Sequence, residues 1–268
     1  MDRITRNYHT HTYRCKHATG DVSDYCRAAT ASGITVLGIS DHVPLPDGRW
    51  KSVRMDIAEL PGYCQAIDAA RDAFPGLTVL KSMECEHGAK YTAFYREELL
   101  GRRGFDYIFF GAHSFPCRDR WLPVYGGITD AATLGAYADY LIDAMASGLY
   151  AFAAHPDVFG CSYLRWDREA VACSRAILSA AAAYRMPLEI NGYGLIKPEI
   201  DTPEGRRRMY PWEPFWELAA EYGVQVIVNS DAHDPKDIVG KTVQAIAIAR
   251  KFGLTLADLS YMETPHVS

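Results

Sequence analysis

Histidine and carboxylate side chains in this 268-residue chain fall into short clusters that are spread from its start to its end. Such side chains bind transition metals, and a mononuclear catalytic zinc site needs only three protein ligands plus water. The inventory therefore predicts a hydrolytic site with two or three metal ions. Neutral imidazoles suit zinc, iron and manganese, and carboxylates can bridge ions. The predicted ligands are His9, His11, His17, His42, Glu84, His113, His155, Asp231 and His233.

The first and last clusters share one spacing, in which a single residue separates two ligands. His9 and His11 form one such pair, and Asp231 and His233 form the other. In an extended chain, side chains two positions apart point to the same side, so each pair can hold one ion. A single pair is weak evidence. Two pairs together with several further histidines favour a metal site.

Some of the neighbouring residues leave alternatives open. Glu84 and Glu86 share one side of a strand, so either could bridge two ions, and Glu84 is preferred because it lies nearer the strand. Cys15 could bind zinc as a thiolate, although a buried free thiol is the more common role. His87 and His266 follow no strand in this pattern, and we expect both at the surface.

The isolated histidines His42, His113 and His155 each follow a short β-type run. A structural histidine is the usual interpretation of such a residue, but the repeated position favours ligands. Plausible helices alternate with the runs, and Asp21 and Gly33 are a good start and stop for the first. The expected strands are 35–40, 77–81, 107–110, 150–153, 188–191 and 224–230, and the expected helices are 21–32, 57–74, 130–147, 167–185 and 212–222.

This alternation of strands and helices predicts an α/β fold with parallel strands and right-handed crossovers. A closed (β/α) barrel is preferred over an open sheet, because ligands from almost every strand can meet at the carboxyl-terminal rim of a barrel. The Pro- and Gly-containing segments 43–53 and 192–211 are expected to be rim loops. The length favours a single domain over residues 1–268.

Composition excludes several classes of protein. The net charge of −5 and the pI near 6.0 give no basic field for nucleic acid, so no nucleic-acid partner is expected. The seven cysteines are scattered and odd in number, which favours free thiols in the cytoplasm. No apolar run of signal-peptide or membrane-spanning length is present, so no membrane association is expected. No pattern indicates an oligomeric state.

Six motifs follow one another in a fixed order between residues 8 and 233. They are Tyr8-His-Thr-His11, Gly38-Ile-Ser-Asp-His42, Met83-Glu-Cys-Glu86, Gly111-Ala-His-Ser114, Ala154-His-Pro-Asp157 and Asn229-Ser-Asp-Ala-His233. This ordered set resembles the polymerase and histidinol phosphatase (PHP) family. The resemblance implies a distorted seven-stranded (β/α) barrel, similar to a TIM barrel, with three divalent zinc, manganese or iron ions at its carboxyl-terminal rim.

The resemblance also implies how the ligands are shared among three ions. One ion is held by His9, His11, Glu84 and Asp231, a second by Glu84, His113 and His155, and a third by His17, His42 and His233. Glu84 then bridges the first two ions. Asp41 resembles a carboxylate that orients a ligand histidine or a bound water.

Within the family, the chain length and two segments resemble the monofunctional histidinol-phosphatases. The segments are Ser162-Tyr-Leu-Arg165 and Glu189-Ile-Asn191, and Arg165 matches an arginine that faces phosphate in those enzymes. The alternative is a surface arginine that pairs with Asp167 or Glu169.

The chain departs from those enzymes where they carry a second phosphate-binding arginine. Their Gly-Leu-Arg-Lys-like segment is replaced here by Gly194-Leu-Ile-Lys197, and Ile196 cannot donate to phosphate. Lys197 could replace the missing charge, but only as a point charge. Otherwise one of three consecutive arginines could do so, namely Arg206, Arg207 and Arg208.

These features predict hydrolysis of a small phosphate monoester by a metal-bridging water. The most specific prediction is L-histidinol phosphate, hydrolysed to L-histidinol and phosphate in histidine biosynthesis. Glu84 would bridge metals, Arg165 would donate to phosphate, and Asp41, Asp231 or His233 could pass a proton to the leaving alkoxide. Rim-loop candidates for the cationic part of the substrate are Asp47, Trp50, Tyr91, Trp121 and Tyr193.

Two other functions stay open at this point. One is a phosphatase or phosphodiesterase for a nucleotide or another small phosphate ester, which the departure at Ile196 favours. The other is a metal-binding module without turnover. The apparently complete ligand set weighs against the module.

Overall fold

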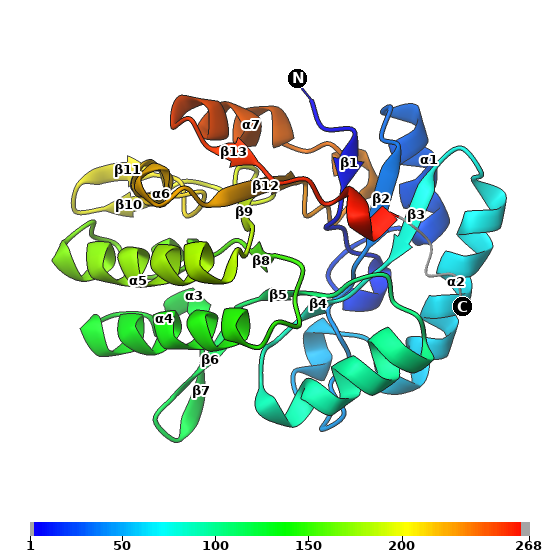
Figure 1. The fold of residues 1–268 in the computed structure, drawn as a ribbon, viewed down its shortest axis with the longest axis horizontal. Helices are drawn as coiled ribbons and strands as arrows, with labels where there is room; N and C mark the ends of the chain where they lie inside the picture. The colour runs from blue at the N-terminus through cyan, green and yellow to red at the C-terminus, as the bar shows by residue number, and fades with distance from the viewer. Residues whose placement is uncertain (1–2, 264–268) are drawn as a thin grey trace. The chain divides into compact units, whose positions relative to one another are not determined.

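The computed structural model describes residues 3–263, so His266 lies outside the described residues. The chain divides into two units (Figure 1). The first unit comprises the described residues of Met1–Phe109, Asn229–Val243 and Asp258–Ser268, and the second comprises Phe110–Val228 and Gln244–Ala257.

Strands and helices alternate along most of the chain. The helices are α1 Val22–Ala31, α2 Leu60–Ala73, α3 Val124–Gly127, α4 Ala131–Ala146, α5 Arg168–Tyr184, α6 Glu213–Ala219 and α7 Thr242–Lys251, with a π-helix at Phe94–Arg102. The strands are β1 Arg6–Asn7, β2 Val36–Ile39, β3 Thr78–Lys81, β4 Glu84–Cys85, β5 Phe109–Gly111, β6 Ser114–Cys117, β7 Arg120–Pro123, β8 Ala153–Ala154, β9 Leu188–Asn191, β10 Ile200–Thr202, β11 Gly205–Arg207, β12 Gln225–Asn229 and β13 Thr255–Leu256. Within residues 3–263, no helix has the length and apolar character needed to cross a membrane.

In the first unit, β1, β2 and β3 form a parallel sheet in that order. All four residues of β2 are buried, which matches a strand covered on both faces. Helix α1 packs against β2 and α2, and α2 packs against β3. Asp21 and Asp24 form a capping box at the start of α1, and Gly33 follows its end with a φ of 74°. The expected start and stop of this helix are confirmed.

In the second unit, β5, β8 and β9 are parallel neighbours, followed in the same sheet by β12 and β13. Helices α4 and α5 lie side by side (Figure 1). Asp130 caps α4 and Asp167 caps α5, so both expected helices begin where the sequence indicates. The α/β class with parallel strands is confirmed. Closure of a seven-stranded barrel and a single domain over 1–268 stay predictions.

Several elements differ from the expected ones. Strand β8 begins at Ala153, whereas the expected run covered 150–153. The segment 192–211, expected to be a loop, contains the antiparallel hairpin of β10 and β11. The π-helix and α7 were not expected, although the buried residues Ala245, Ile246 and Ala249 give α7 a helical periodicity.

Candidate metal centre

Backbone contacts bring the first and last ligand clusters together in the first unit. Thr10 and Ala232 form a parallel β-bridge, and the His11 amide donates to the Ala232 carbonyl at 2.9 Å. The Thr19 amide donates to the His233 carbonyl at 2.9 Å. Ligands at both ends of the chain therefore share one edge.

His9 and His11 have donor atoms at distances from each other, from Asp231 and from Glu84 that suit ligands of one ion. The Nε2 atoms of His9 and His11 are 3.0 Å apart, and they lie 3.3 and 3.1 Å from Asp231 Oδ1. The same two atoms lie 3.5 and 3.4 Å from Glu84 Oε2. Ligands held about 2.0–2.1 Å from a tetrahedral ion are about 3.3 Å from one another. The four residues therefore fit a metal ion.

Glu84 also contacts a third imidazole, that of His42. The two residues form a parallel β-bridge, and His42 Nδ1 lies 2.9 Å from Glu84 Oε2. Glu86, the alternative bridging carboxylate, accepts instead from Arg54 Nη2 at 3.0 Å, and both side chains are buried. Glu84, not Glu86, therefore lies among the histidines.

A second group of donor atoms contains His17, His42 and His233, which lie within 4.8 Å of one another. His17 Nδ1 lies 2.7 Å from the Cys15 carbonyl, and His233 Nδ1 lies 2.9 Å from the Asp231 carbonyl. A carbonyl only accepts, so each Nδ1 carries the proton and each Nε2 presents its lone pair as a potential metal ligand. These two Nε2 atoms are 3.2 Å apart.

The surroundings favour the metal-binding protonation states. Burial and the neighbouring His11 lower the pKa of His233 to about 3, so its imidazole is neutral at neutral pH. Burial alone would raise the pKa of Asp231, but His9 and His11 hold it below the ordinary carboxyl range. Asp231 also has a positive φ of 52°, an uncommon conformation that occurs at functional sites.

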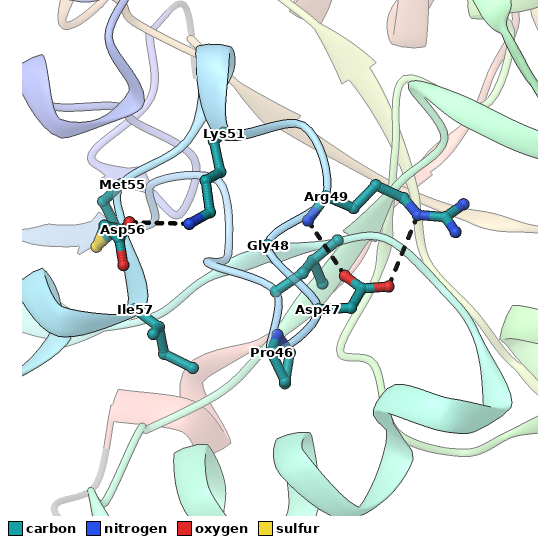
Figure 2. A pocket seen from close by; sticks show the side chains of 9 residues that line it. Pro46, Asp47, Gly48, Arg49, Lys51, Met55, Asp56 and Ile57 are labelled. Atoms are coloured by element: carbon teal, nitrogen blue, oxygen red, sulfur yellow. Dashed lines mark hydrogen bonds and ion pairs between the residues drawn. The ribbon is translucent and has the colours of Figure 1, made fainter.

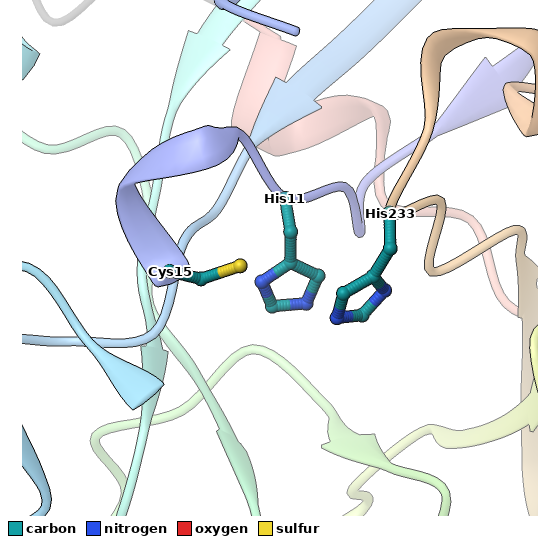
Figure 3. A group of neighbouring side chains, drawn as sticks. All are labelled: His11, Cys15 and His233. Atoms are coloured by element: carbon teal, nitrogen blue, oxygen red, sulfur yellow. The ribbon is translucent and has the colours of Figure 1, made fainter. Parts of the chain in front are cut away.

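Cys15 lies beside this group with His11 and His233 (Figure 3). The side chain is fully buried, and burial raises the pKa of its thiol to about 12. A protonated thiol is a poor zinc ligand, because the thiolate is the form that binds. The interpretation of Cys15 as a buried free thiol therefore agrees with its environment.

Asp41 lies behind the ligands and holds the backbone near His11. Its Oδ1 accepts from the Thr12 amide at 2.8 Å, and its Oδ2 accepts from the Thr12 hydroxyl at 2.7 Å. The carboxyl is fully buried, and burial raises its pKa to about 6. These contacts position the turn that follows His11.

The second unit contains the remaining two predicted ligands, His113 and His155. Their ring centroids are 5.1 Å apart. His155 is buried, has a positive φ of 33°, and donates its amide to Glu189 Oε2 at 3.1 Å. The same Glu189 atom accepts from Asn191 Nδ2 at 2.8 Å. Glu189 and Asn191 thus position His155.

The buried carboxyl of Asp157, two residues after His155, was not singled out as a site residue. Its Oδ2 accepts from the Trp212 amide at 2.5 Å and from Trp216 Nε1 at 2.8 Å. This carboxyl fixes the start of α6 beside the His155 turn. No sequence spacing indicates a contact over such a separation.

Arg165 is exposed, and the acids expected to compete for it have other partners. Asp167 accepts from Tyr163 Oη at 2.8 Å and caps α5. Glu169 pairs with Arg168 at 2.9 Å. The arginine therefore lies at the surface beside the start of α5, where a ligand can reach it.

The remaining basic candidates differ in their surroundings. Lys197 is half-buried with its Nζ 4.7 Å from the centre of the Tyr193 ring. Arg206 is exposed and lies 3.7 Å from Glu199. Arg207 donates to the carbonyls of Gly160, Tyr163, Arg208 and Met209, and Arg208 donates to the Lys197 carbonyl. The Arg207 guanidinium is thus held in place by hydrogen bonds to backbone carbonyls.

The loop 43–53 contains a cavity of about 210 Å³ lined by Leu45–Arg49, Lys51 and Met55–Ile57 (Figure 2). Asp47 in this loop lies 3.7 Å from Arg49 Nε and accepts from Lys90 Nζ at 2.6 Å and from Tyr91 Oη at 3.0 Å. Trp50 packs against the Arg54 guanidinium.

Trp121, on the β6–β7 hairpin, packs edge-on against Tyr140. Together with Asp47, Trp50, Tyr91 and Tyr193, it is one of the rim candidates for a cationic group.

His87 differs from its predicted place. It was expected at the surface, but its exposed fraction is 5%. The whole run from Lys81 to His87 is buried, because the chain stays inside the fold after β4.

Comparisons with known proteins identify relatives of this chain. The family model of the PHP domain matches residues 7–192. The Deinococcus radiodurans protein named "Probable histidinol-phosphatase" is 30% identical over 255 residues, which cover 91% of this chain and 92% of that protein.

Two solved structures share the fold. The HisK protein from Listeria monocytogenes has a TM-score of 0.69 at 20% identity and covers 87% of this chain and 97% of that chain. The histidinol phosphate phosphatase from Lactococcus lactis, complexed with zinc, L-histidinol and phosphate, has a TM-score of 0.71 at 17% identity and covers 96% of this chain and 97% of that one. From the matched family model and the 30% identical relative, we conclude that the chain belongs to the PHP domain family.

Proposed function

We propose that this chain is a metal-dependent phosphatase that hydrolyses L-histidinol phosphate to L-histidinol and phosphate. One observation carries the proposal: Glu84 Oε2 lies 2.9–3.5 Å from nitrogen atoms of His9, His11 and His42. Buried imidazole nitrogens grouped around one carboxylate oxygen are the set of ligand atoms that zinc, manganese and iron bind. The Deinococcus relative supports the choice of substrate.

The proposal assigns three divalent zinc, manganese or iron ions to the predicted ligands. In the first unit these are His9, His11, His17, His42, Glu84, Asp231 and His233. His113 and His155 of the second unit are the remaining ligands of the family pattern. The seven free cysteines favour the reducing cytoplasm as the place of action.

The bound ions supply a Lewis acid and lower the pKa of a coordinated water. The protein side chains do the rest. Asp41 fixes the turn after His11 through Thr12, and carbonyl contacts hold the His17 and His233 rings with their Nε2 atoms 3.2 Å apart. Arg165, Lys197 and Arg206 bind the phosphate oxygens, and Asp41, Asp231 or His233 passes a proton to the leaving alkoxide.

One specific observation favours a second candidate, hydrolysis of a nucleotide or another small phosphate ester. Ile196 is 38% exposed at the position where histidinol-phosphatases carry an arginine, so it offers phosphate no donor there. A changed set of phosphate contacts can accompany a changed substrate.

The test compares substrates with the metal-loaded protein. Initial rates are measured for L-histidinol phosphate, AMP and p-nitrophenyl phosphate, with bound zinc, manganese and iron quantified in the same samples. We expect kcat/KM for histidinol phosphate to exceed the others by at least about 100-fold. Faster hydrolysis of AMP favours the second candidate. Full metal content without hydrolysis of any ester contradicts both and indicates a binding module.

A further inference from the structure

Three tyrosine side chains of the second unit surround the Lys197 ammonium. Its Nζ lies 4.7 Å from the centre of the Tyr193 ring, 5.1 Å from that of Tyr125 and 5.9 Å from that of Tyr210. The Tyr125 hydroxyl donates to the Tyr210 hydroxyl at 3.3 Å. Attraction between the ammonium and the ring faces limits where the end of this flexible side chain can lie.

The turn that carries Lys197 is fixed by its own backbone. The amides of Ile196 and Lys197 donate to the Tyr193 carbonyl at 2.9 and 3.3 Å, and the Gly194 amide donates to Asn191 Oδ1 at 2.9 Å. A Cβ on Gly194 would lie 2.4 Å from the Tyr210 ring and 2.5 Å from its carbonyl oxygen. Only glycine therefore permits this approach of the turn to Tyr210.

The same cluster is connected to His155, a proposed metal ligand. Asn191 and the His155 amide both donate to Glu189 Oε2, so one buried carboxylate holds the Lys197 turn and the His155 backbone. The rings of Tyr210 and His155 are 6.0 Å apart between centroids. The ammonium thus lies one aromatic ring away from His155.

The polar atoms of the cluster suit an anion. An ammonium is a compact positive charge with three donors, and a tyrosine hydroxyl adds a neutral donor. Glu199, two positions after Lys197, lies 3.7 Å from both Arg206 and Arg208. Tyr210 is buried but Tyr125 is 44% exposed, so the cluster opens to solvent on one side.

We propose that Lys197, Tyr125, Tyr193 and Tyr210 form a phosphate subsite beside His155 and replace the arginine that Ile196 displaces. The inference rests on the proposed function, because it assigns the phosphoryl oxygens of that substrate to these groups. Lys197 and the hydroxyls contact the anion. Asn191 and Glu189 are positioning residues that set the place of the turn.

The experiment compares the wild type with Lys197→Met, Lys197→Arg and the control Lys251→Met, all loaded with metal. Lys251 is an exposed lysine of the same unit whose partner is Glu213. The dissociation constant of inorganic phosphate is measured by calorimetry. KM and kcat are measured with L-histidinol phosphate. Metal content and melting temperature are recorded for each variant.

We expect Lys197→Met to weaken phosphate binding and raise KM by at least about tenfold, the loss expected for one charge-assisted hydrogen bond. Lys197→Arg should restore most of the phosphate affinity and reverse most of the change in KM. Lys251→Met should match the wild type. Phosphate binding within twofold of the wild type in Lys197→Met, at unchanged metal content, would overturn the subsite.

A second variant keeps the test valid if Lys197→Met does not fold. Tyr193→Phe keeps the ring against the ammonium and removes only the hydroxyl, and it should weaken phosphate binding about threefold. Unchanged binding in this variant overturns the assignment of Tyr193. The calorimetric arm needs no turnover, so it separates failure of the subsite from failure of the proposed function, in which the wild type hydrolyses no ester.

Discussion

The proposed metal ligands of the first unit and the basic side chains of the second unit are held in different ways. His9, His11 and Glu84 are buried at strand ends, and backbone bridges fix the segments that carry them. Arg165 and Arg206 are exposed on a loop and a hairpin strand, and long flexible side chains carry their charges. Burial and backbone contacts restrict the first group, whereas exposed side chains with many rotatable bonds carry the second.

This difference separates the type of reaction from the choice of substrate. A rigid group of imidazoles and carboxylates determines which ions bind, and hence the chemistry. Loop side chains can change without disturbing that group, because they contribute little to the core. Ile196, which stands where histidinol-phosphatases carry an arginine, is an example of such a change in a loop side chain. Five predictions test this separation, beginning with the largest expected effect.

Removal of metal should abolish hydrolysis and destabilise the first unit more than the second. At an ion concentration about 1,000 times the dissociation constant, the lost binding costs about 4 kcal/mol of unfolding free energy. Hydrogen exchange with and without a chelator measures this. Protection should fall most in residues 7–12, 40–43 and 229–233. An equal loss of hydrogen-exchange protection in α4 and α5 would contradict the proposed difference between the two units.

Glu84→Gln should lower metal affinity by at least about 100-fold and reduce kcat in proportion, because Oε2 is shared by three imidazoles. Elemental analysis and kinetics measure both effects. Glu86→Gln is the matched control: it should keep its metal and lose about 3–5 kcal/mol of stability from the buried pair with Arg54. Full metal content in Glu84→Gln would refute the bridging role.

Arg165→Ala should raise KM about tenfold and leave metal content unchanged, because it removes one charged donor to phosphate. Steady-state kinetics at low ionic strength give the value. Arg168→Ala, which removes the neighbouring exposed arginine paired with Glu169, is the control. The same change in both variants would mean that only the general surface charge acts.

Ile196→Arg should lower KM for a phosphate monoester about threefold, because it restores a donor at an exposed position of a fixed turn. Its kcat should stay within twofold. If KM fell for AMP alone, the result would favour hydrolysis of a nucleotide as the function.

Arg206→Ala should have the smallest effect, less than about twofold in KM. The side chain is exposed and lies 3.7 Å from Glu199, a distance typical of weak surface pairs. A tenfold rise would instead place Arg206 among the essential phosphate contacts.

The sequence predicts the rigid part of the molecule better than the adaptable part. Caps at Asp21, Asp130 and Asp167 mark helix starts through local hydrogen bonds, and buried runs such as Val36–Ile39 mark strands. Ligand spacing indicates the metal group because side chains two apart must share a face.

The missed features depend on contacts between distant segments or on weak local signals. The β10–β11 hairpin is short and mostly exposed, so it shows no alternation of apolar residues. The approach of Tyr125 and Tyr210 to Lys197 depends on the turn at Gly194, which no periodicity reveals. His87 was misplaced because burial beyond a strand end leaves no pattern.

The bond between Asn7 and Ser230 joins side chains that are 223 positions apart, at 2.6 Å. A ribosome releases the early histidines long before Asp231 and His233, because synthesis runs from the N-terminus. Under the proposed function, a nascent chain therefore carries only part of the ligand set, and we expect its affinity for ions to stay low until translation is nearly finished. Acquisition of the proposed metals would then be a late maturation step.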